Sequence, residues 1–140
     1  MARTLGIDLG TRRIGVALSD TKGKVATPFT VLQRTSDDND CRVIADIATA
    51  EHIKTVVLGY PLSMDGTVGG AAMVAESFAK KLKEHGVRVK LWDERLTTAE
   101  AERSLKHTGM KGRARRAVVD KVAASVILQS YLDAQHARKR

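Results

Sequence analysis

Short apolar runs alternate with polar turns over the first third of the chain, a pattern typical of β-strands. Residues 5–9 and 14–18 are two such runs joined by a glycine-containing polar turn, and residues 25–32 form a third run. Short connections favour an antiparallel meander of three strands. Pro28 lies inside the third run, so that strand is expected at a sheet edge or at a bulge, because proline donates no backbone hydrogen bond.

From residue 36 onward, helical spacing and strand-like runs alternate, with capping residues before the helical segments and Gly86 as a C-terminal stop. The predicted strands cover residues 55–60 and 87–92, and the predicted helices cover residues 36–51, 71–85, 97–107 and 117–135. The pattern predicts an α/β fold with a mixed five-stranded sheet. Strands 1–3 should be antiparallel, strands 4 and 5 parallel to strand 1, and helices should cover both faces.

Composition narrows the class of protein. The chain has 140 residues, of which 43% are hydrophobic and 4% aromatic, so one domain over residues 1–140 with an aliphatic core is expected. A net charge of +8 indicates nucleic acid or an anionic membrane as the partner. The sequence shows no signal-peptide pattern and no run long enough to span a bilayer, so a cytoplasmic protein without a membrane partner is expected. Cys41 is the single cysteine, which excludes an internal disulfide.

Asp8 is an acid inside an otherwise apolar, glycine-rich predicted strand. Burying an ionised carboxylate costs several kcal/mol unless a cation, a metal or several donors compensate it. Gly6 and Gly10 flank it and leave room for a ligand to approach the backbone. The alternative is a structural Asp that caps the turn through the amides of Gly10 or Thr11.

Other carboxylates follow the last predicted strand and open the last predicted helix. Asp93 and Glu94 leave the end of the strand at residues 87–92, and Asp120 is expected in the first turn of the helix. That helix has a core-facing stripe at positions 120, 123, 124, 127 and 128. An N-terminal Asp that only interacts with the helix dipole is the alternative interpretation of Asp120. Hard oxygen ligands without a Cys or His cluster favour Mg²⁺ or Mn²⁺, which in pairs support phosphodiester cleavage.

Four motifs together resemble the YqgF (RuvX) family over essentially the whole chain. They are Gly-Ile-Asp-Leu-Gly with the hairpin that follows it, and the segments at residues 58–67, 93–98 and 119–125. The resemblance implies an RNase H-like fold related to RuvC-type resolvases. It implies a metal-dependent nuclease that processes the 5′ end of pre-16S rRNA, or alternatively a Holliday junction resolvase. By similarity, the catalytic and metal-ligating acids fall on Asp8, Glu94 and Asp120.

The chain departs from the broader RNase H-like pattern, in which an acid commonly follows the fourth strand. Here that strand ends in Gly-Tyr-Pro, and the nearest acid is Asp65. Asp93 and Asp65 therefore remain alternatives to Glu94, and Ser63 and Thr97 are further candidates.

Basic side chains near these motifs are expected to contact nucleic acid. The segment at residues 111–116 is expected to be a mobile loop that orders on a phosphate backbone, or else a solvated connection. The candidates are Arg12, Arg13, Arg95, Lys111, Arg113, Arg115, Arg116 and Lys121.

Two rival functions belong to other classes. Residues 6–11 also resemble the first phosphate motif of actin, Hsp70 and sugar-kinase ATPases, but a second glycine-rich phosphate motif is missing from the sequence. A non-catalytic RNA-binding module on the same fold is the second rival. The sequence leaves open RNA or branched DNA as substrate, one or two metal ions, and a monomer or homodimer. A junction resolvase needs a two-fold dimer, whereas an RNA-trimming enzyme can act as a monomer.

Overall fold

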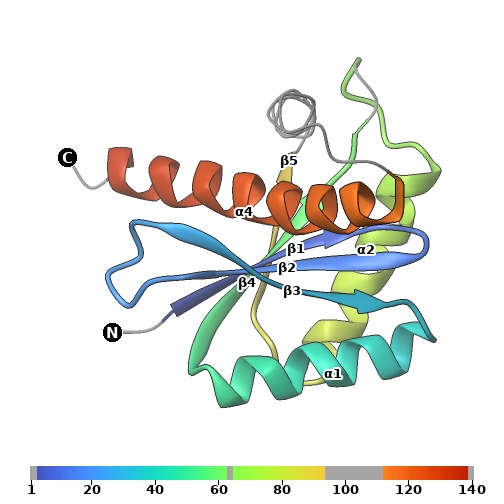
Figure 1. Cartoon of the computed structure of the whole chain (residues 1–140), viewed down its shortest axis with the longest axis horizontal. Helices are drawn as coiled ribbons and strands as arrows, with labels where there is room; N and C mark the ends of the chain where they lie inside the picture. Colours follow the sequence, from blue (N-terminus) through green and yellow to red (C-terminus); the bar gives the residue numbers. More distant parts are fainter. Residues whose placement is uncertain (1–2, 63–64, 94–111, 139–140) are drawn as a thin grey trace.

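The computed structural model describes residues 3–62, 65–93 and 112–138 (Figure 1). In chain order the elements are β1 (Arg3–Leu9), β2 (Arg13–Ser19), β3 (Ala26–Gln33), α1 (Asp37–Ala50), β4 (Ile53–Tyr60), α2 (Gly70–Glu84), β5 (Val89–Asp93) and α4 (Gly112–Arg138).

The strands form one mixed sheet in the order β3-β2-β1-β4-β5. β1 pairs antiparallel with β2 and β2 with β3, whereas β4 is parallel to both β1 and β5. This confirms the predicted topology. β3 is an edge strand, and its register shifts where Val16 opposes Thr30 but Ala17 opposes Pro28. The predicted edge position and the predicted bulge are therefore both present.

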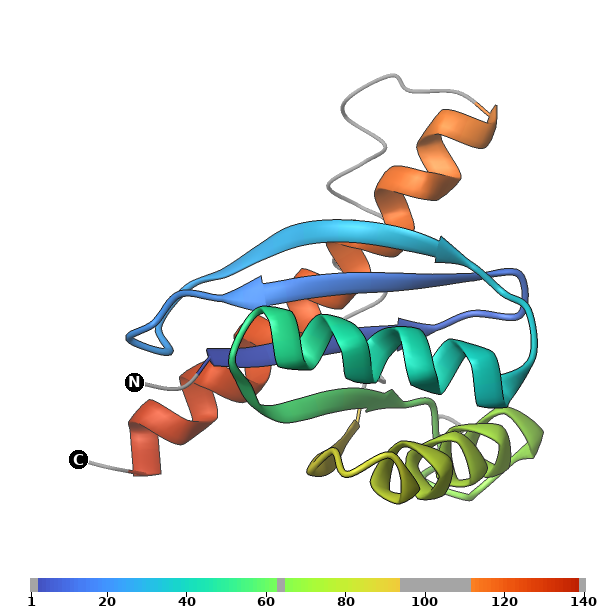
Figure 2. The same cartoon turned by 90° about the horizontal axis from the view of Figure 1, so that it is seen from below.

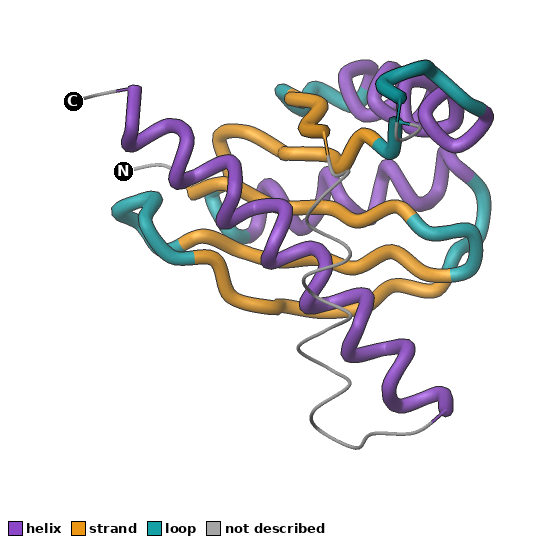
Figure 3. The backbone as a smooth tube through the Cα atoms, turned by 90° about the horizontal axis from the view of Figure 1, so that it is seen from above, coloured by secondary structure: helices purple, strands orange, loops and turns teal. Residues whose placement is uncertain are grey.

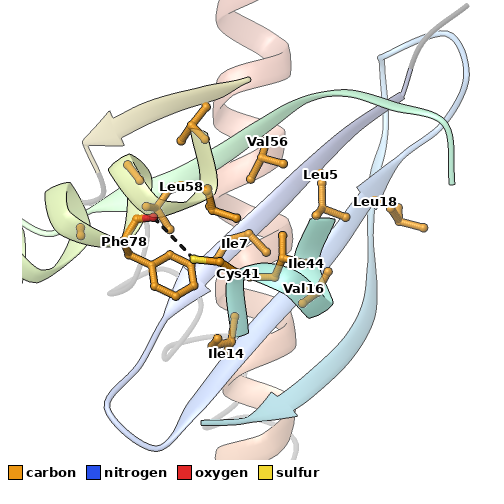
Figure 4. Packing of buried hydrophobic residues seen from close by; sticks show 14 residues of the cluster. Leu5, Ile7, Ile14, Val16, Leu18, Cys41, Ile44, Val56, Leu58 and Phe78 are labelled. Carbon is orange, nitrogen blue, oxygen red and sulfur yellow. Dashed lines mark hydrogen bonds between the residues drawn. The ribbon is translucent and has the colours of Figure 1, made fainter. Parts of the chain in front are cut away.

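Helices cover both faces of the sheet, as predicted. α1 and α2 pack together on one face, and α4 alone covers the other face among the described elements (Figures 1 and 3). Figure 2 shows the twisted sheet between these two layers. The face under α1 and α2 buries the larger apolar cluster, which includes Leu5, Ile7, Ile44 and Phe78 (Figure 4). The face under α4 buries Ala17, Val57, Ala124, Ile127, Leu128 and Leu132.

Helix α1 begins as its capping residues predict. The Ser36 side chain accepts a hydrogen bond of 3.1 Å from the backbone N–H of Asn39. β5 begins at Val89, two residues later than predicted, because the N–H of Val87 instead bonds to the carbonyl of Leu82 at the end of α2.

The prediction for residues 111–116 is wrong over most of that segment. α4 begins at Gly112, so Arg113, Arg115 and Arg116 lie in its first two turns and not in a loop. The physical reason is that Arg and Ala are strong helix formers, and no proline interrupts the segment. Lys111 lies outside the described residues. The early start also corrects the position of Asp120, which lies in the third turn, beyond the reach of the helix dipole.

Gly6 fixes how closely α4 approaches the sheet. A Cβ at this position would lie 2.7 Å from Cβ of Leu128 and 3.0 Å from the carbonyl oxygen of Ala124. Both distances are too short for ordinary packing, and the second involves helix backbone, which cannot rotate away. Glycine at position 6 therefore allows a close contact between the centre of β1 and α4.

We predict that Gly6→Ala destabilises the protein by about 2 kcal/mol, because the added methyl overpacks this contact. The matched control is Gly70→Ala at the start of α2, where the added methyl meets nothing within 4 Å. The control should leave the free energy of unfolding unchanged or raise it by up to about 1 kcal/mol. Urea unfolding measures both. Equal stability for the Gly6 variant and wild type would contradict this packing.

Candidate active site

Asp8 lies at the carboxyl end of β1 on the face that α4 covers. It is the penultimate residue of the strand and is half-buried. Its partner on β2 is Gly15. On β4, Ile7 pairs with Leu58, so the residue beside Asp8 on that strand is Gly59. Asp8 is thus bordered by glycines on both neighbouring strands. A carboxylate between two residues without side chains has room for a metal ion and a phosphate beside it.

The register of α4 brings position 120 toward Asp8. From the contact at Gly6, Asp8 lies about 7 Å further along β1. From Ala124, position 120 lies about 6 Å back along α4. The two displacements point to the same end of the sheet, because the C-terminal end of α4 lies over the beginning of β1 (Figure 1). Ala123, Ala124, Ile127 and Leu128 are all buried, which confirms the predicted stripe at those four positions.

The carboxyl end of β5 lies at the same edge of the sheet, since Tyr60 of β4 pairs with Asp93. The indole N–H of Trp92 donates a hydrogen bond of 3.1 Å to Oγ of Ser130 on α4, so Trp92 lies on the face that carries Asp8. Successive strand residues alternate between faces. Asp93 therefore lies on the opposite face, where it is exposed. Glu94 lies outside the described residues.

The remaining acidic and polar candidates either lie in the connection after β4 or lie outside the described residues. Asp65 is exposed in the connection after β4, where its Oδ1 accepts hydrogen bonds from the N–H of Thr67 at 3.0 Å and from its hydroxyl at 2.7 Å. This local turn fixes its side chain within its own loop. Within the described ranges, no three His, Cys, Asp or Glu residues gather into a metal-binding cluster. Ser63, Arg95 and Thr97 lie outside those ranges.

The turn that follows Asp8 carries the first two basic candidates. Arg12 is exposed in the turn between β1 and β2, and Arg13 begins β2. The N–H of Gly10 closes the turn on the carbonyl of Arg13 at 2.9 Å. A Cβ on Gly10 would lie 2.6 Å from that same carbonyl oxygen, so the tight turn requires glycine. This closed turn keeps the backbone of both arginines near the end of the strand that carries Asp8.

Arg34 holds this turn through hydrogen bonds to its backbone, a role that was not predicted from the sequence. Its Nη1 donates a hydrogen bond of 2.9 Å to the carbonyl of Gly10, and its backbone N–H donates one of 2.9 Å to the carbonyl of Arg12. Its guanidinium also lies over the Phe78 ring, 5.6 Å from the centroid. Arg34 therefore joins the turn beside Asp8 to the packed layer under the sheet.

Arg34 is held in turn by a buried carboxylate, Asp40. The Asp40 side chain is 4% exposed and accepts a hydrogen bond of 2.9 Å from Nε of Arg34. It also accepts bonds from the N–H and hydroxyl of Thr35. Asp37 provides a second carboxylate at 2.5 Å from Nη2 of Arg34. Such a fully bonded pair is costly to break, because one partner alone would leave an uncompensated buried charge.

We predict that Arg34→Met lowers the free energy of unfolding by about 3 kcal/mol, because Asp40 then loses its cation. The control is Arg42→Met, since the Arg42–Asp46 pair on α1 is exposed, with side chains 59% and 72% accessible. An exposed pair contributes at most about 0.5 kcal/mol. Urea unfolding of the two variants should separate them clearly. Similar losses in both would show that the Arg34 network contributes no more than a surface pair.

Two other titratable groups are structural. Cys41 is buried, and its thiol donates to the carbonyl of Phe78 at 3.7 Å. Burial, with nearby Asp37, raises the pKa of the Cys41 thiol to about 12, so it is not a nucleophile at neutral pH. The hydroxyl of Tyr60 donates a bond of 2.6 Å to Glu76, which raises the pKa of Tyr60 and joins the end of β4 to α2.

The sheet order and the helices on its two faces define a structural class, the RNase H-like fold. RuvC of T. thermophilus, solved in complex with a Holliday junction substrate, superposes with a TM-score of 0.56 at 15% identity, covering 97% of this chain and 96% of that one. The Fowlpox virus resolvase, in complex with Holliday junction DNA, gives 0.55 at 11% identity, covering 95% and 98%. These similarities confirm the predicted fold.

Sequence comparison identifies the family. The model of the RuvX family, described as Holliday junction resolvase, matches residues 2–134, and the chain belongs to that family. A protein of Syntrophus aciditrophicus (strain SB) named "Putative pre-16S rRNA nuclease" is 47% identical over 133 residues, covering 94% of this chain and 89% of the relative. One of the same name from Shouchella clausii (strain KSM-K16) is 44% identical over 136 residues, covering 95% and 96%. Among the described residues, no helix has the length and apolar character to cross a membrane.

Proposed function

We propose that this protein is a divalent-metal-dependent nuclease that cleaves phosphodiester bonds in structured nucleic acid, with Asp8, Glu94 and Asp120 as catalytic acids. The observation that carries the proposal is the convergence of β1 and α4. Asp8 stands between two glycines on the α4 face, and the contact at Gly6 brings position 120 to the same end of that face. Glu94 is preferred over Asp93 because Asp93 lies on the opposite face.

The residues present suit Mg²⁺ or Mn²⁺. Asp8 offers a hard carboxylate oxygen, and Gly15 on the neighbouring strand leaves room beside it for water and phosphate oxygens. Asp120 and Glu94 would complete the ligand set. When bound, such an ion lowers the pKa of water and neutralises charge on the phosphate.

The chain's own residues would bind and orient the substrate. Arg12 and Arg13, in the turn that the Arg34 network holds beside Asp8, would contact phosphates of the substrate. The first turns of α4 add Arg113, Arg115, Arg116 and Lys121 on the helix that carries Asp120. Such contacts position the nucleic acid and carry no sequence information.

A precursor of 16S rRNA is the preferred substrate, because relatives at 47% and 44% identity carry the name of a pre-16S rRNA nuclease. A four-way DNA junction is the second candidate, because the family model is described as a Holliday junction resolvase.

We predict that Asp8→Asn and Glu94→Gln each lower metal-dependent cleavage by more than about a hundredfold, because even residues that only support a metal ligand cost tenfold to a hundredfold. Nucleic-acid affinity should stay within about twofold. The melting temperature of Asp8→Asn without metal should hold or rise, since repulsion between carboxylates is relieved. The assay is cleavage of an end-labelled RNA precursor and of a four-way junction, side by side, with Mg²⁺, Mn²⁺ or EDTA.

Asp93→Asn is the matched control, since it removes a neighbouring carboxylate from the other face of the sheet, and it should cleave at the wild-type rate. Loss of cleavage in Asp93→Asn with activity retained in Glu94→Gln would reverse the assignment of the second acid. Tight, salt-dependent binding without metal-dependent cleavage of either substrate would favour the non-catalytic RNA-binding module.

A further inference from the structure

A cavity lies at the end of the α4 face opposite Asp8. Its volume is about 280 Å³, and it opens between the beginnings of β1, β4 and β5, the turn between β2 and β3, and the C-terminal half of α4. Thr4 and Thr55 form part of its floor, and Tyr131 and Gln135 part of its α4 wall. Arg12 and Arg13, which the sequence predicts to contact nucleic acid, do not line it.

The lining is polar, with several cations. Lys22, Lys54, Arg88 and Lys90 line the cavity, and among the residues that the structure describes no Asp or Glu does. All four side chains are exposed. Within the part of the chain that the structure describes, none of the four forms an ion pair with a carboxylate. Four like charges around one concave surface repel one another, and an anion in the cavity would relieve that repulsion.

The turn between β2 and β3, which carries Lys22, forms one wall of the cavity. Hydrogen bonds from its backbone to side chains of α4 hold it in place. The amide of Gln129 donates a bond of 2.8 Å to the carbonyl of Lys24 and accepts one of 2.9 Å from the N–H of Ala26. The ring Nε2 of His136 bonds to the carbonyl of Gly23 at 2.8 Å. Asp20 closes the turn by accepting from the N–H groups of Lys24 and Val25, which lowers the pKa of Asp20. These hydrogen bonds therefore fix the position of this side of the cavity.

The cavity and Asp8 lie on one face at a defined separation. Thr4 at the cavity and Asp8 are four residues apart along β1, which is about 13 Å. Because each strand of B-form DNA carries one phosphate per about 3.4 Å, this separation corresponds to about four base pairs of such a duplex. α4 lies over β1 between these two points, so a nucleic acid that contacts both would pass along the outer side of this helix.

We propose that this cavity is a second phosphate-binding site, which holds the backbone of the same nucleic acid about four base pairs from the bond at Asp8. The proposal rests on the proposed function for the identity of its ligand. The concave shape, the polar lining and the shared face with Asp8 favour a nucleic-acid backbone over a lipid surface, which would require exposed apolar groups beside the charges. The site contributes affinity and register, and it takes no part in the chemical step.

The test is the salt dependence of binding, measured by fluorescence anisotropy with a labelled RNA duplex of about 20 base pairs in EDTA, long enough to span the roughly four base pairs between the two sites. The cavity variant is Lys54→Ala, Arg88→Ala and Lys90→Ala together. The matched control is Arg42→Ala, Lys80→Ala and Lys83→Ala, which removes three exposed cations from α1 and α2 on the opposite face. Both variants lose the same net charge. Thermal melting should show wild-type folding for both, since all six positions are exposed.

The cavity variant should lower the slope of log K against log salt by about two to three units, since each phosphate that the protein no longer neutralises removes about one unit. The control should change the slope by less than about one unit. Equal changes in both variants would overturn the cavity site, because net charge alone would then explain the binding. Wild-type affinity and slope in the cavity variant would overturn it and leave the proposed function intact, whereas a wild-type protein that binds no RNA duplex would overturn both.

Two further experiments distinguish a nucleic-acid backbone from other ligands that carry phosphate. Inorganic phosphate at millimolar concentration, followed by NMR shifts of Lys90 and Thr55 amides, should have less effect than the RNA duplex. Saturable phosphate binding with RNA affinity unchanged in the cavity variant would overturn the proposal in favour of a small-anion site. Vesicles of anionic phospholipid that bind the wild type but not the cavity variant, with RNA affinity unchanged, would overturn it in favour of a membrane contact.

Discussion

The close contact between Gly6 and α4 determines the geometry of the candidate active site. A side chain at position 6 would collide with Leu128 and with the backbone of Ala124, so glycine permits the helix to lie directly on β1. That contact fixes the register of α4 against the strand, and the register determines which helical residue lies near Asp8. Apolar packing of Ile127 and Leu128 then stabilises the helix in that position. A packing constraint in the middle of the sheet thus acts on the chemistry at its end.

A second constraint holds the turn beside Asp8. The buried pair of Arg34 and Asp40 joins this turn to α1, and the Phe78 ring supports the guanidinium from below. The α4 face carries Asp8 at the carboxyl end of β1, beside Arg12 and Arg13, and a cation-lined cavity at the beginnings of the parallel strands. Cations at both ends of one face suit a polyanion that contacts both.

Periodicity is sufficient to predict the strands, their mixed order and the two layers of helices, because alternation and helical spacing are local properties. It fails where the outcome depends on long-range contacts. In the sequence Asp40 is one of several capping residues, and only the folded chain shows that it is buried against Arg34. The side of the sheet on which Asp93 lies depends on the register of β5 against β4. The early start of α4 differs from the prediction because a run of charges suggests a loop, although Arg and Ala favour helix.

We propose that Asp8 and Asp120 hold the same divalent cation. The most direct test is a crystal structure of the protein soaked in Mn²⁺, with the ion located by its anomalous signal. We expect a peak within about 2.5 Å of a carboxylate oxygen of Asp8 and of one from Asp120. At saturating Mn²⁺, a peak on Asp8 with Asp120 turned away, or no peak at Asp8, would contradict it.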